Sequence, residues 1–368
     1  MHRCYGAGLC YQHGAGWHSE VWERSNCQKA GPVLEAYCDS VEKTRAKDQK
    51  RQASEHYKEI RRKSKVTQST TGPSNDYGLN ASHEDIDPNE LHKLCEENSK
   101  RANLSPEEII RMELQTRGQS NCPLWHQLRK QRLTASRFGE ICKRRKSTPC
   151  ARLVVEILYP RPISSESLRW GTENEKIALE EYCKESGNSV QQAGLFICSE
   201  HGYLAASPDG IVVLKGSPSR KGLVEVKCPY SATRKTGKAY TPMEAAKKIK
   251  NFPLEVKPNG QLALKKNHNH FYQVQGQLHI TGYKWCDYVV WTPSGLHVER
   301  IEYDAAFWER KMFPNLKWFY FNCLLPETAS PRHPQGLPIR EPSTVTTEAR
   351  KRKARDNGGT ANNKRAKI

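Results

Sequence analysis

A glutamate and a lysine two positions apart, Glu225 and Lys227, are the pair in this 368-residue chain most suggestive of chemistry. Residues i and i+2 of a β-strand point to the same face, so the carboxylate and the ammonium can both point into one cleft. Apolar and β-branched residues predict a strand over 222–228, and Pro229 ends it. Such a pair usually lies on a solvated strand edge, but the near-continuous apolar run indicates burial, where a charged pair requires partners.

Two more carboxylates and a glutamine occur within about a hundred residues of this pair. Asp209 lies in a Ser-Pro-Asp-Gly turn between two apolar runs, where a turn can aim its carboxylate at the next strand, although such a triplet is most often only a turn. Glu175 lies upstream, on the first turn of the helix predicted from Glu173, and Gln273 lies downstream. Carboxylates that converge repel one another unless a cation lies between them, and hard oxygen ligands favour Mg²⁺ or Mn²⁺ over zinc.

The order and the residues of these segments resemble those of the YqaJ-like viral recombinases and the bacteriophage lambda exonuclease, members of the PD-(D/E)XK nuclease superfamily. The resemblance extends from about Trp125 to about His333. It ends in the strand that carries Trp291-Thr-Pro. It rests on five motifs in the family's order: residues 125–136, 171–175, 206–210, 224–229 and 270–275.

This resemblance implies that Asp209 and Glu225 bind catalytic Mg²⁺, or Mn²⁺, together with the carbonyl oxygen of Val226. Glu175 completes the acidic set. No other cofactor is implied. A metal ion can supply positive charge, a deprotonated water near neutral pH and in-line geometry for phosphodiester hydrolysis.

The resemblance also implies roles for the remaining residues. Lys227 holds or deprotonates the attacking water and neutralises charge on the phosphate, and Gln273 orients the lysine or the water. Arg129 and Ser136 match positions that grip a 5′-phosphate in the exonuclease, and an arginine fork with a hydroxyl beside a helix N-terminus makes an anion site. The chain departs from the phage enzyme at His270, where that enzyme has a tyrosine.

Basic residues outnumber acidic residues, 59 Lys or Arg against 40 Asp or Glu, which gives a net charge of +19 and a pI of about 9.4. The segments 43–65 and 332–368 each hold ten Lys or Arg against three Asp or Glu, so most of the excess lies in two arms. Such arms can hold phosphate non-specifically and raise association rates; solubility or a targeting address explains them about equally well.

The thirteen cysteines are odd in number and scattered singly, which predicts reduced thiols in an intracellular protein. Neither a signal peptide nor an apolar run of membrane-spanning length is expected. Two basic clusters, 351–355 and 364–367, predict nuclear localisation, with an electrostatic tail as the alternative. A histidine and cysteine cluster near the N-terminus matches no regular zinc module: His2, Cys4, Cys10, His13 and His18.

The expected fold class is α/β, a restriction-endonuclease-like PD-(D/E)XK core with a mixed central sheet flanked by helices and flexible terminal extensions. The expected divisions are a basic extension and linker over 1–85, a helical lead-in over 86–120, the nuclease domain over 121–332 and a disordered basic tail over 333–368. Helices are predicted at 40–65, 88–100, 106–117, after Ser136, and at 153–158, 173–184, 272–281 and 304–321. Strands are predicted at 194–198, 204–206, 211–214, 223–228, 286–291 and 296–303.

The insertion 231–268 is rich in lysine, and these side chains either line a DNA channel or lie on a solvated loop: Lys235, Lys238, Lys247, Lys248, Lys250, Lys265 and Lys266. Segment 31–80 weakly resembles a linker found beside the nuclease in some animal transposon-derived proteins. This resemblance implies either a fragment of a longer product or a domesticated transposon descendant.

Two classes of function remain. The first is a metal-dependent DNA nuclease in recombination or repair, acting as an exonuclease from a 5′ end, with an endonuclease or ribonuclease on the same scaffold as a variant. The second is a transposon-derived DNA-binding protein without turnover. A homo-oligomer around DNA is compatible with the first. The complete set of mutually repelling carboxylates favours catalysis.

Overall fold

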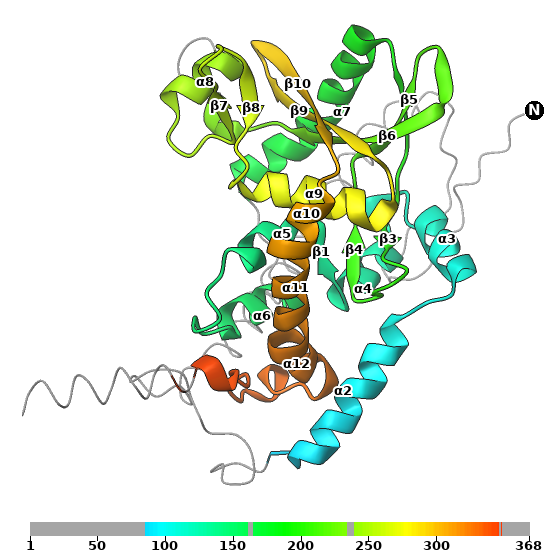
Figure 1. Cartoon of the computed structure of the whole chain (residues 1–368), viewed down its shortest axis with the longest axis vertical. Coiled ribbons are helices and arrows are strands. Elements are labelled where there is room, and N and C mark those ends of the chain that lie inside the picture. The colour runs from blue at the N-terminus through cyan, green and yellow to red at the C-terminus, as the bar shows by residue number, and fades with distance from the viewer. Residues whose placement is uncertain (1–84, 161–164, 234–238, 346, 348–368) are drawn as a thin grey trace, which may run out of the picture. The chain divides into compact units, whose positions relative to one another are not determined.

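The computed structural model describes residues 85–160, 165–233, 239–345 and 347 (Figure 1). The predicted helix at 40–65, the histidine and cysteine cluster and both basic clusters lie outside these residues. None of the described helices is both long and apolar enough to cross a membrane.

The strands form three sheets. A mixed five-stranded sheet has the order β10-β9-β6-β5-β2, a three-stranded sheet has the order β1-β4-β3, and β7 and β8 pair alone. Only β6–β9 and β1–β4 are parallel pairs within these sheets. The strands are β1 Leu133–Thr134, β2 Ser189–Gln191, β3 Phe196–Ile197, β4 Leu204–Ala206, β5 Gly210–Leu214, β6 Ser217–Lys227, β7 Leu254–Val256, β8 Leu262–Leu264, β9 Trp285–Thr292 and β10 Gly295–Glu302.

Helices flank these sheets and form a lead-in and a C-terminal column (Figure 1). The α-helices are α2 Pro88–Ala102, α3 Pro106–Gln115, α4 Pro123–Lys130, α5 Ala135–Cys142, α6 Ala151–Leu158, α7 Glu166–Ser186, α8 Pro242–Lys248, α9 Asn269–Thr281, α10 Ala305–Phe307, α11 Phe313–Phe319 and α12 Leu325–Ala329. Short 3₁₀ segments are η1 Gln119–Asn121, η2 Tyr230–Ala232 and η5 His333–Gln335, and π-helical segments are η3 Trp308–Met312 and η4 Tyr320–Leu324.

The alternation of side chains along β6 divides the core of the five-stranded sheet into two layers. Val224 and Val226 belong to a buried cluster with Ala178 and Tyr182 of α7. Leu223 belongs to the opposite cluster, with Val274 and Leu278 of α9 among its members. Because successive strand residues face opposite ways, Glu225 and Lys227 share the α9 side with Leu223.

The predicted fold class, a mixed central sheet flanked by helices, is confirmed. Several details differ. Two predicted strands, β3 and β4, lie in the smaller sheet, β2 was missed, and the insertion contains α8 and the β7–β8 hairpin. The single helix expected over 304–321 is a run of short α- and π-helical segments that continues to Ala329. Its buried Trp308, Met312 and Leu316 pack in the largest core cluster. Packing of these side chains in the core takes precedence over the regular 3.6-residue period from which a single helix was predicted.

The predicted boundary of a disordered tail at residue 333 is wrong for residues 333–345. Ile339 and Val345 are buried, and Arg340 donates to Asp85 ahead of α2. Glu341 accepts from the backbone N–H groups of Cys150 and Ala151 at 2.7 and 3.1 Å, at the start of α6. This polar segment is ordered because its charges satisfy ion pairs and helix donors that are remote in the sequence.

Helices α5 and α9 cross in close contact, and a glycine makes this possible. A Cβ atom added to Gly139 of α5 lies only 2.6 Å from Cα of Asn269, the first residue of α9. Backbone cannot yield as a flexible side chain does, so α9 has to shift if residue 139 carries a methyl group.

We expect Gly139→Ala to lower the free energy of unfolding by about 1–3 kcal/mol, because it overpacks this crossing. Gly171→Ala is the control: Gly171 lies inside α7 with no atom within 4 Å of an added Cβ, so alanine should stabilise that helix by about 1 kcal/mol. Thermal and denaturant unfolding measure both. Equal shifts for the two variants contradict the close-packing explanation.

Candidate active site

The C-terminal end of β6 opens into a cavity of about 430 Å³. Its walls come from α7, the end of β6 and the start of α9. Val226 also borders the cavity. The lining residues that can take part in acid–base chemistry or bind a ligand are Glu175, Lys227, Cys228, His268 and His270. Glu225 lies two residues before Lys227 on the same strand, and it is only 1% exposed.

Three side chains hold the buried Glu225 carboxylate. Oε1 accepts from the ammonium of Lys227 and, at 2.5 Å, from Nε2 of Gln273. Oε2 accepts from Nε2 of Gln277 at 2.6 Å. The strand pair predicted from the sequence is therefore an ion pair, and α9 supplies two amides one helical turn apart.

Asp209 lies just before β5, beside the same strand. Its Oδ2 accepts from the backbone N–H of Val226 at 2.7 Å, and its own N–H donates to the carbonyl of Val224 at 3.2 Å. The Ser-Pro-Asp-Gly turn thus points this carboxylate at β6, as predicted.

The three acidic residues repel one another. Burial raises the pKa of Asp209 well above its usual value, and the charges of Glu225 and Glu175 raise it further, against the effect of Lys227. The pKa of Glu175 is also raised, by desolvation and then by Glu225. Helix α7 begins at Glu166, seven residues before the predicted start at Glu173. Glu175 therefore lies in the middle of the helix and not on its first turn as predicted. Its side chain nevertheless faces the cavity.

Lys227 is the counter-charge of this acidic group. Burial alone lowers the pKa of its ammonium, but Glu225 and Asp209 outweigh burial and the net pKa is raised. Lys227 is therefore a cation at neutral pH and cannot accept a proton while the carboxylates remain ionised.

The residue types fit a hard divalent cation: two or three carboxylates and the carbonyl oxygen of Val226. The elevated pKa values of Asp209 and Glu175 indicate negative charge that a single lysine does not neutralise. In the described part of the chain, however, no group of three His, Cys, Asp or Glu side chains is already arranged as a metal-binding cluster. Metal binding by these residues remains a prediction.

Sequence reasoning missed two polar residues near the site, Gln277 and His268, and assigned no role to His270. His270 shares a 2.6 Å hydrogen bond between Nδ1 and the hydroxyl of buried Tyr288, and the pKa of His270 is well below its usual value because of burial and of Lys227. Burial and nearby lysines lower the pKa of His268 to about 4. Both imidazoles are neutral at physiological pH. The i, i+4 spacing of Gln273 and Gln277 is the signal that points to the missed amide.

Arg129 and Ser136 line a second cavity of about 180 Å³, formed by α4, β1, α5 and α6. Burial, then the positive charge of Arg137, lowers the pKa of Arg129 to about 10. Its guanidinium stacks over Trp125 at 4.1 Å, and within the described residues it has no carboxylate partner. Arg137, by contrast, pairs with Glu140 at 3.0 Å. The first turn of α5, which carries Ser136, has no side-chain cap from Thr134. The first backbone N–H groups of a helix have no partner within the helix.

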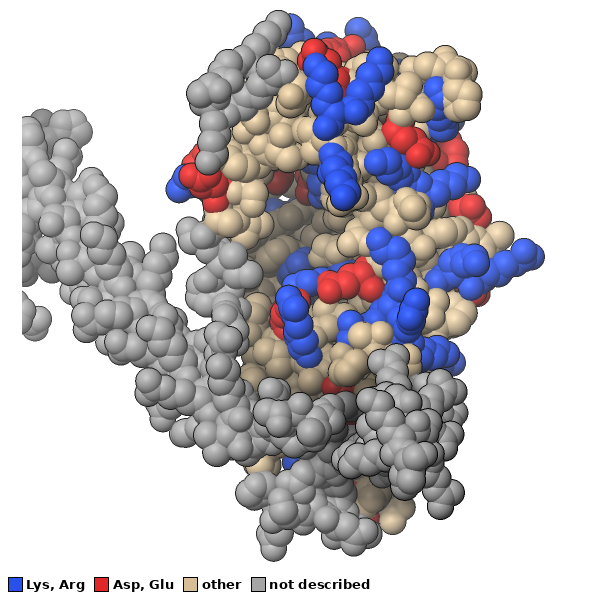
Figure 2. Space-filling model, turned by 90° about the vertical axis from the view of Figure 1, so that its left-hand side faces the viewer, with Lys and Arg blue, Asp and Glu red and all other residues tan. Residues whose placement is uncertain are grey.

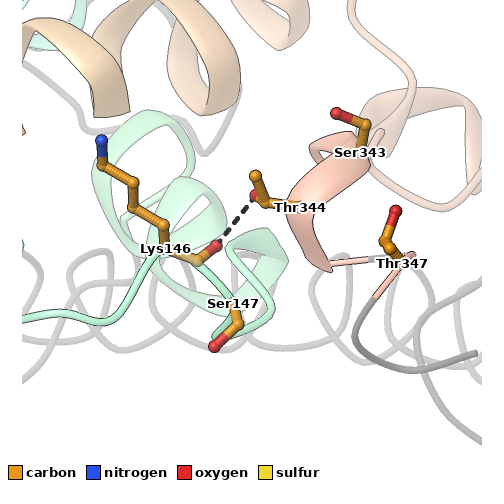
Figure 3. Close-up of a pocket in the computed structure, with 5 residues that line it drawn as sticks. All are labelled: Lys146, Ser147, Ser343, Thr344 and Thr347. Atoms are coloured by element: carbon orange, nitrogen blue, oxygen red, sulfur yellow. Dashed lines mark hydrogen bonds between the residues drawn. The ribbon is translucent and has the colours of Figure 1, made fainter. Parts of the chain in front are cut away.

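A third hollow, of about 470 Å³, lies between the loop after α5 and the last described helical turn (Figure 3). Lys146 and Ser147 face Ser343, Thr344 and Thr347, and Thr344 donates to the carbonyl of Lys146 at 3.2 Å. The described residues that line this hollow provide one cation and hydroxyl groups. The predicted site residues Glu175 and Lys227 line the cavity at the end of β6 instead.

Parts of this chain are similar to known proteins. Residues 124–284 match the family model of the YqaJ-like viral recombinase domain. The chain is 30% identical over 184 residues to the alkaline nuclease of Orgyia pseudotsugata multicapsid polyhedrosis virus, covering 48% of this chain and 42% of that protein. It thus spans less than half the length of this curated relative. The predicted resemblance to YqaJ-like viral recombinases is confirmed.

Two solved structures are also similar. The alkaline exonuclease LHK-Exo from Laribacter hongkongensis is 26% identical, with 53% of this chain and 89% of that chain covered and a TM-score of 0.39. The shutoff and exonuclease protein from Kaposi's sarcoma-associated herpesvirus is 12% identical, with 70% and 77% covered and a TM-score of 0.36.

The raised pKa of Asp209 predicts a pH-dependent stability difference. A carboxyl group whose pKa is raised on folding stabilises the folded state below its unfolded pKa and loses that stabilisation as pH rises through the folded value. Asp209→Asn keeps an acceptor for Val226 N–H and carries no charge. In a chelating buffer, its melting temperature relative to wild type should therefore increase as pH rises above about 4. Thermal unfolding across pH 5 to 8 tests this, and a pH-independent difference contradicts it.

Proposed function

We propose that this chain is a divalent-metal-dependent deoxyribonuclease that hydrolyses phosphodiester bonds and acts as an exonuclease from 5′ ends. The observation that carries the proposal is the cavity at the end of β6, where a lysine paired to a buried glutamate faces solvent beside two further carboxylates. Structural ion pairs are normally charge-balanced; this one leaves excess negative charge facing a cavity.

Mg²⁺, or Mn²⁺, is the expected cofactor, with Asp209, Glu225, Glu175 and the Val226 carbonyl as its ligands. When bound, it supplies Lewis-acid activation of water and neutralises the phosphate. The protein's own contribution comes from Lys227, whose ammonium stabilises negative charge on the phosphate oxygens and orients the nucleophilic water. Gln273 holds the same Glu225 oxygen as Lys227, so it keeps the lysine's counter-charge in place.

The Arg129 cavity supports preference for a 5′ end. It combines an arginine without a described acidic partner, a serine hydroxyl and the free donors of a helix N-terminus. This set of donors suits a terminal phosphate dianion, which offers more charge and more free oxygens than an internal diester.

Lys and Arg side chains gather above and below a hollow on the face seen in Figure 2. This is the left-hand side of Figure 1, where α8 and the β7–β8 hairpin lie above α5 and α6. Exposed cations of these segments include Lys143, Arg145, Lys146, Lys247, Lys248 and Lys250. We propose that they hold the DNA backbone. Lys265 differs, since it donates to the carbonyl of Phe252 at 2.7 Å.

A role in DNA recombination or repair, nuclear localisation through the C-terminal basic clusters, and a homo-oligomeric state are part of the same proposal. The alternatives are an endonuclease on this scaffold and a DNA-binding protein without turnover. End-labelled linear DNA incubated with Mg²⁺ separates them: an exonuclease releases the label from one end first, an endonuclease yields internal fragments, and a binding protein leaves the DNA intact.

Lys227→Ala should reduce turnover about 10²–10³-fold, because its charge acts on the transition state, while the affinity for DNA stays close to wild type. Lys221→Ala is the matched control, since Lys221 is an exposed lysine on the same strand. Turnover is measured with end-labelled DNA and affinity in a chelating buffer. Equal losses of affinity and rate make Lys227 a simple phosphate contact, and no cleavage by the wild-type chain overturns the proposed function.

Arg129→Ala should remove any preference for 5′-phosphorylated over 5′-hydroxyl DNA, since a charge-assisted contact contributes about 1.5–3 kcal/mol only when the phosphate is present. Arg137→Ala is the control, because Arg137 lines the same cavity but is already paired with Glu140. Initial rates on the two kinds of end provide the measurement. If Arg129→Ala slows both kinds equally, the phosphate anchor is wrong and the endonuclease alternative takes its place.

A further inference from the structure

Gln277 is a buried residue that contacts the carboxylate of Glu225. It lies one turn after Gln273 on α9, is 1% exposed, and donates from Nε2 to Oε2 of Glu225 at 2.6 Å. The two amides thus reach different oxygens of a single carboxylate, Gln273 holding Oε1 and Gln277 holding Oε2.

The other end of this amide has no partner. Oε1 of Gln277 is buried, and no donor of the described residues reaches it. Turning the amide over places Oε1 against Oε2 of Glu225, where two acceptors face each other, so Glu225 fixes the amide orientation. A buried acceptor without a donor lowers stability. The amide therefore pairs the buried Glu225 carboxylate at the cost of leaving its own acceptor unsatisfied.

Gln275 shows what a structural glutamine looks like on the same helix. It is fully buried, its Nε2 donates to the carbonyl of Glu302 at 2.9 Å, and its Oε1 accepts from the N–H of Asp304 at 2.8 Å. Both ends are satisfied by backbone groups at the end of β10 and just after it. Gln277 differs because its single partner is the carboxylate at the cavity.

The hydrogen bonds of Glu225 leave little acceptor capacity. A carboxylate offers about four lone-pair sites. In the described structure Oε1 accepts twice, from Lys227 and Gln273, and Oε2 accepts once, from Gln277. One further ligand can therefore bind only through Oε2, provided that the carboxylate does not rotate.

We propose that Gln277 is a positioning residue for the divalent cation. It fixes the rotation of the Glu225 carboxylate, so that the one remaining acceptor of Oε2 is offered to the metal while Oε1 stays paired with Lys227. The inference rests on the proposed function, because it assumes that Glu225 is a metal ligand. It adds a residue that never touches the metal or DNA and acts through Glu225.

The test compares Gln277→Met with Gln275→Met in the full chain. Methionine keeps the length of the side chain and removes the donor. Calorimetry with Mg²⁺ alone measures binding without turnover, and cleavage assays at varied Mg²⁺ and DNA separate kcat from KM. Thermal unfolding in a chelating buffer reports stability.

Gln277→Met should weaken Mg²⁺ binding and raise the Mg²⁺ concentration at half-maximal rate by about 10–100-fold, the usual effect of removing a group that orients a metal ligand. The KM for DNA should hold. Gln275→Met should lower the melting temperature and leave Mg²⁺ affinity unchanged. If Gln277→Met does not fold, Gln277→Asn serves instead, since it keeps the amide but shortens its reach, and the same weakening is expected.

Wild-type Mg²⁺ affinity in the folded Gln277 variant overturns the inference. So does parallel weakening in both glutamine variants in proportion to their loss of stability, because that pattern marks a structural role. A wild-type chain that neither binds Mg²⁺ nor cleaves DNA refutes the proposed function itself. A wild-type chain that binds and cleaves, with an indifferent Gln277 variant, refutes only the role of Gln277.

Discussion

The burial of a charged carboxylate, Glu225, in the middle of the sheet is the constraint on which the rest of the site depends. An ionised carboxylate cannot remain in an apolar core unless its oxygens are paired. Lys227 supplies the charge, and Gln273 and Gln277 supply two further donors. Both donors come from α9, and the close packing of α9 on α5 requires glycine at position 139, where α5 meets the first residue of α9.

The same arrangement leaves charge unbalanced on the open side of the sheet. Asp209 and Glu175 have raised pKa values because they share one lysine with Glu225 and are partly removed from water. A fold selected for stability alone has little reason to place three carboxylates around one ammonium. A site that recruits a divalent cation and a phosphate does, because both partners relieve this imbalance.

The Arg129 cavity has the complementary property, an excess of positive charge. Its guanidinium is buried beside another cation, which lowers its pKa to about 10, and no carboxylate among the described residues neutralises it. The protein therefore presents an anionic cavity suited to a metal and a cationic cavity suited to a terminal phosphate.

The sequence by itself determined the features that are local. The period of two along β6 puts Glu225 and Lys227 on one face, the turn before β5 directs Asp209 at that strand, and the order of the motifs identifies the family resemblance. Tertiary structure decided the rest. The role of Gln277, the neutral imidazoles of His268 and His270, and the ordering of residues 333–345 through Arg340 and Glu341 all depend on partners that are distant in sequence. A periodic pattern reports which way a side chain points; it does not report which other segment the fold brings to meet it.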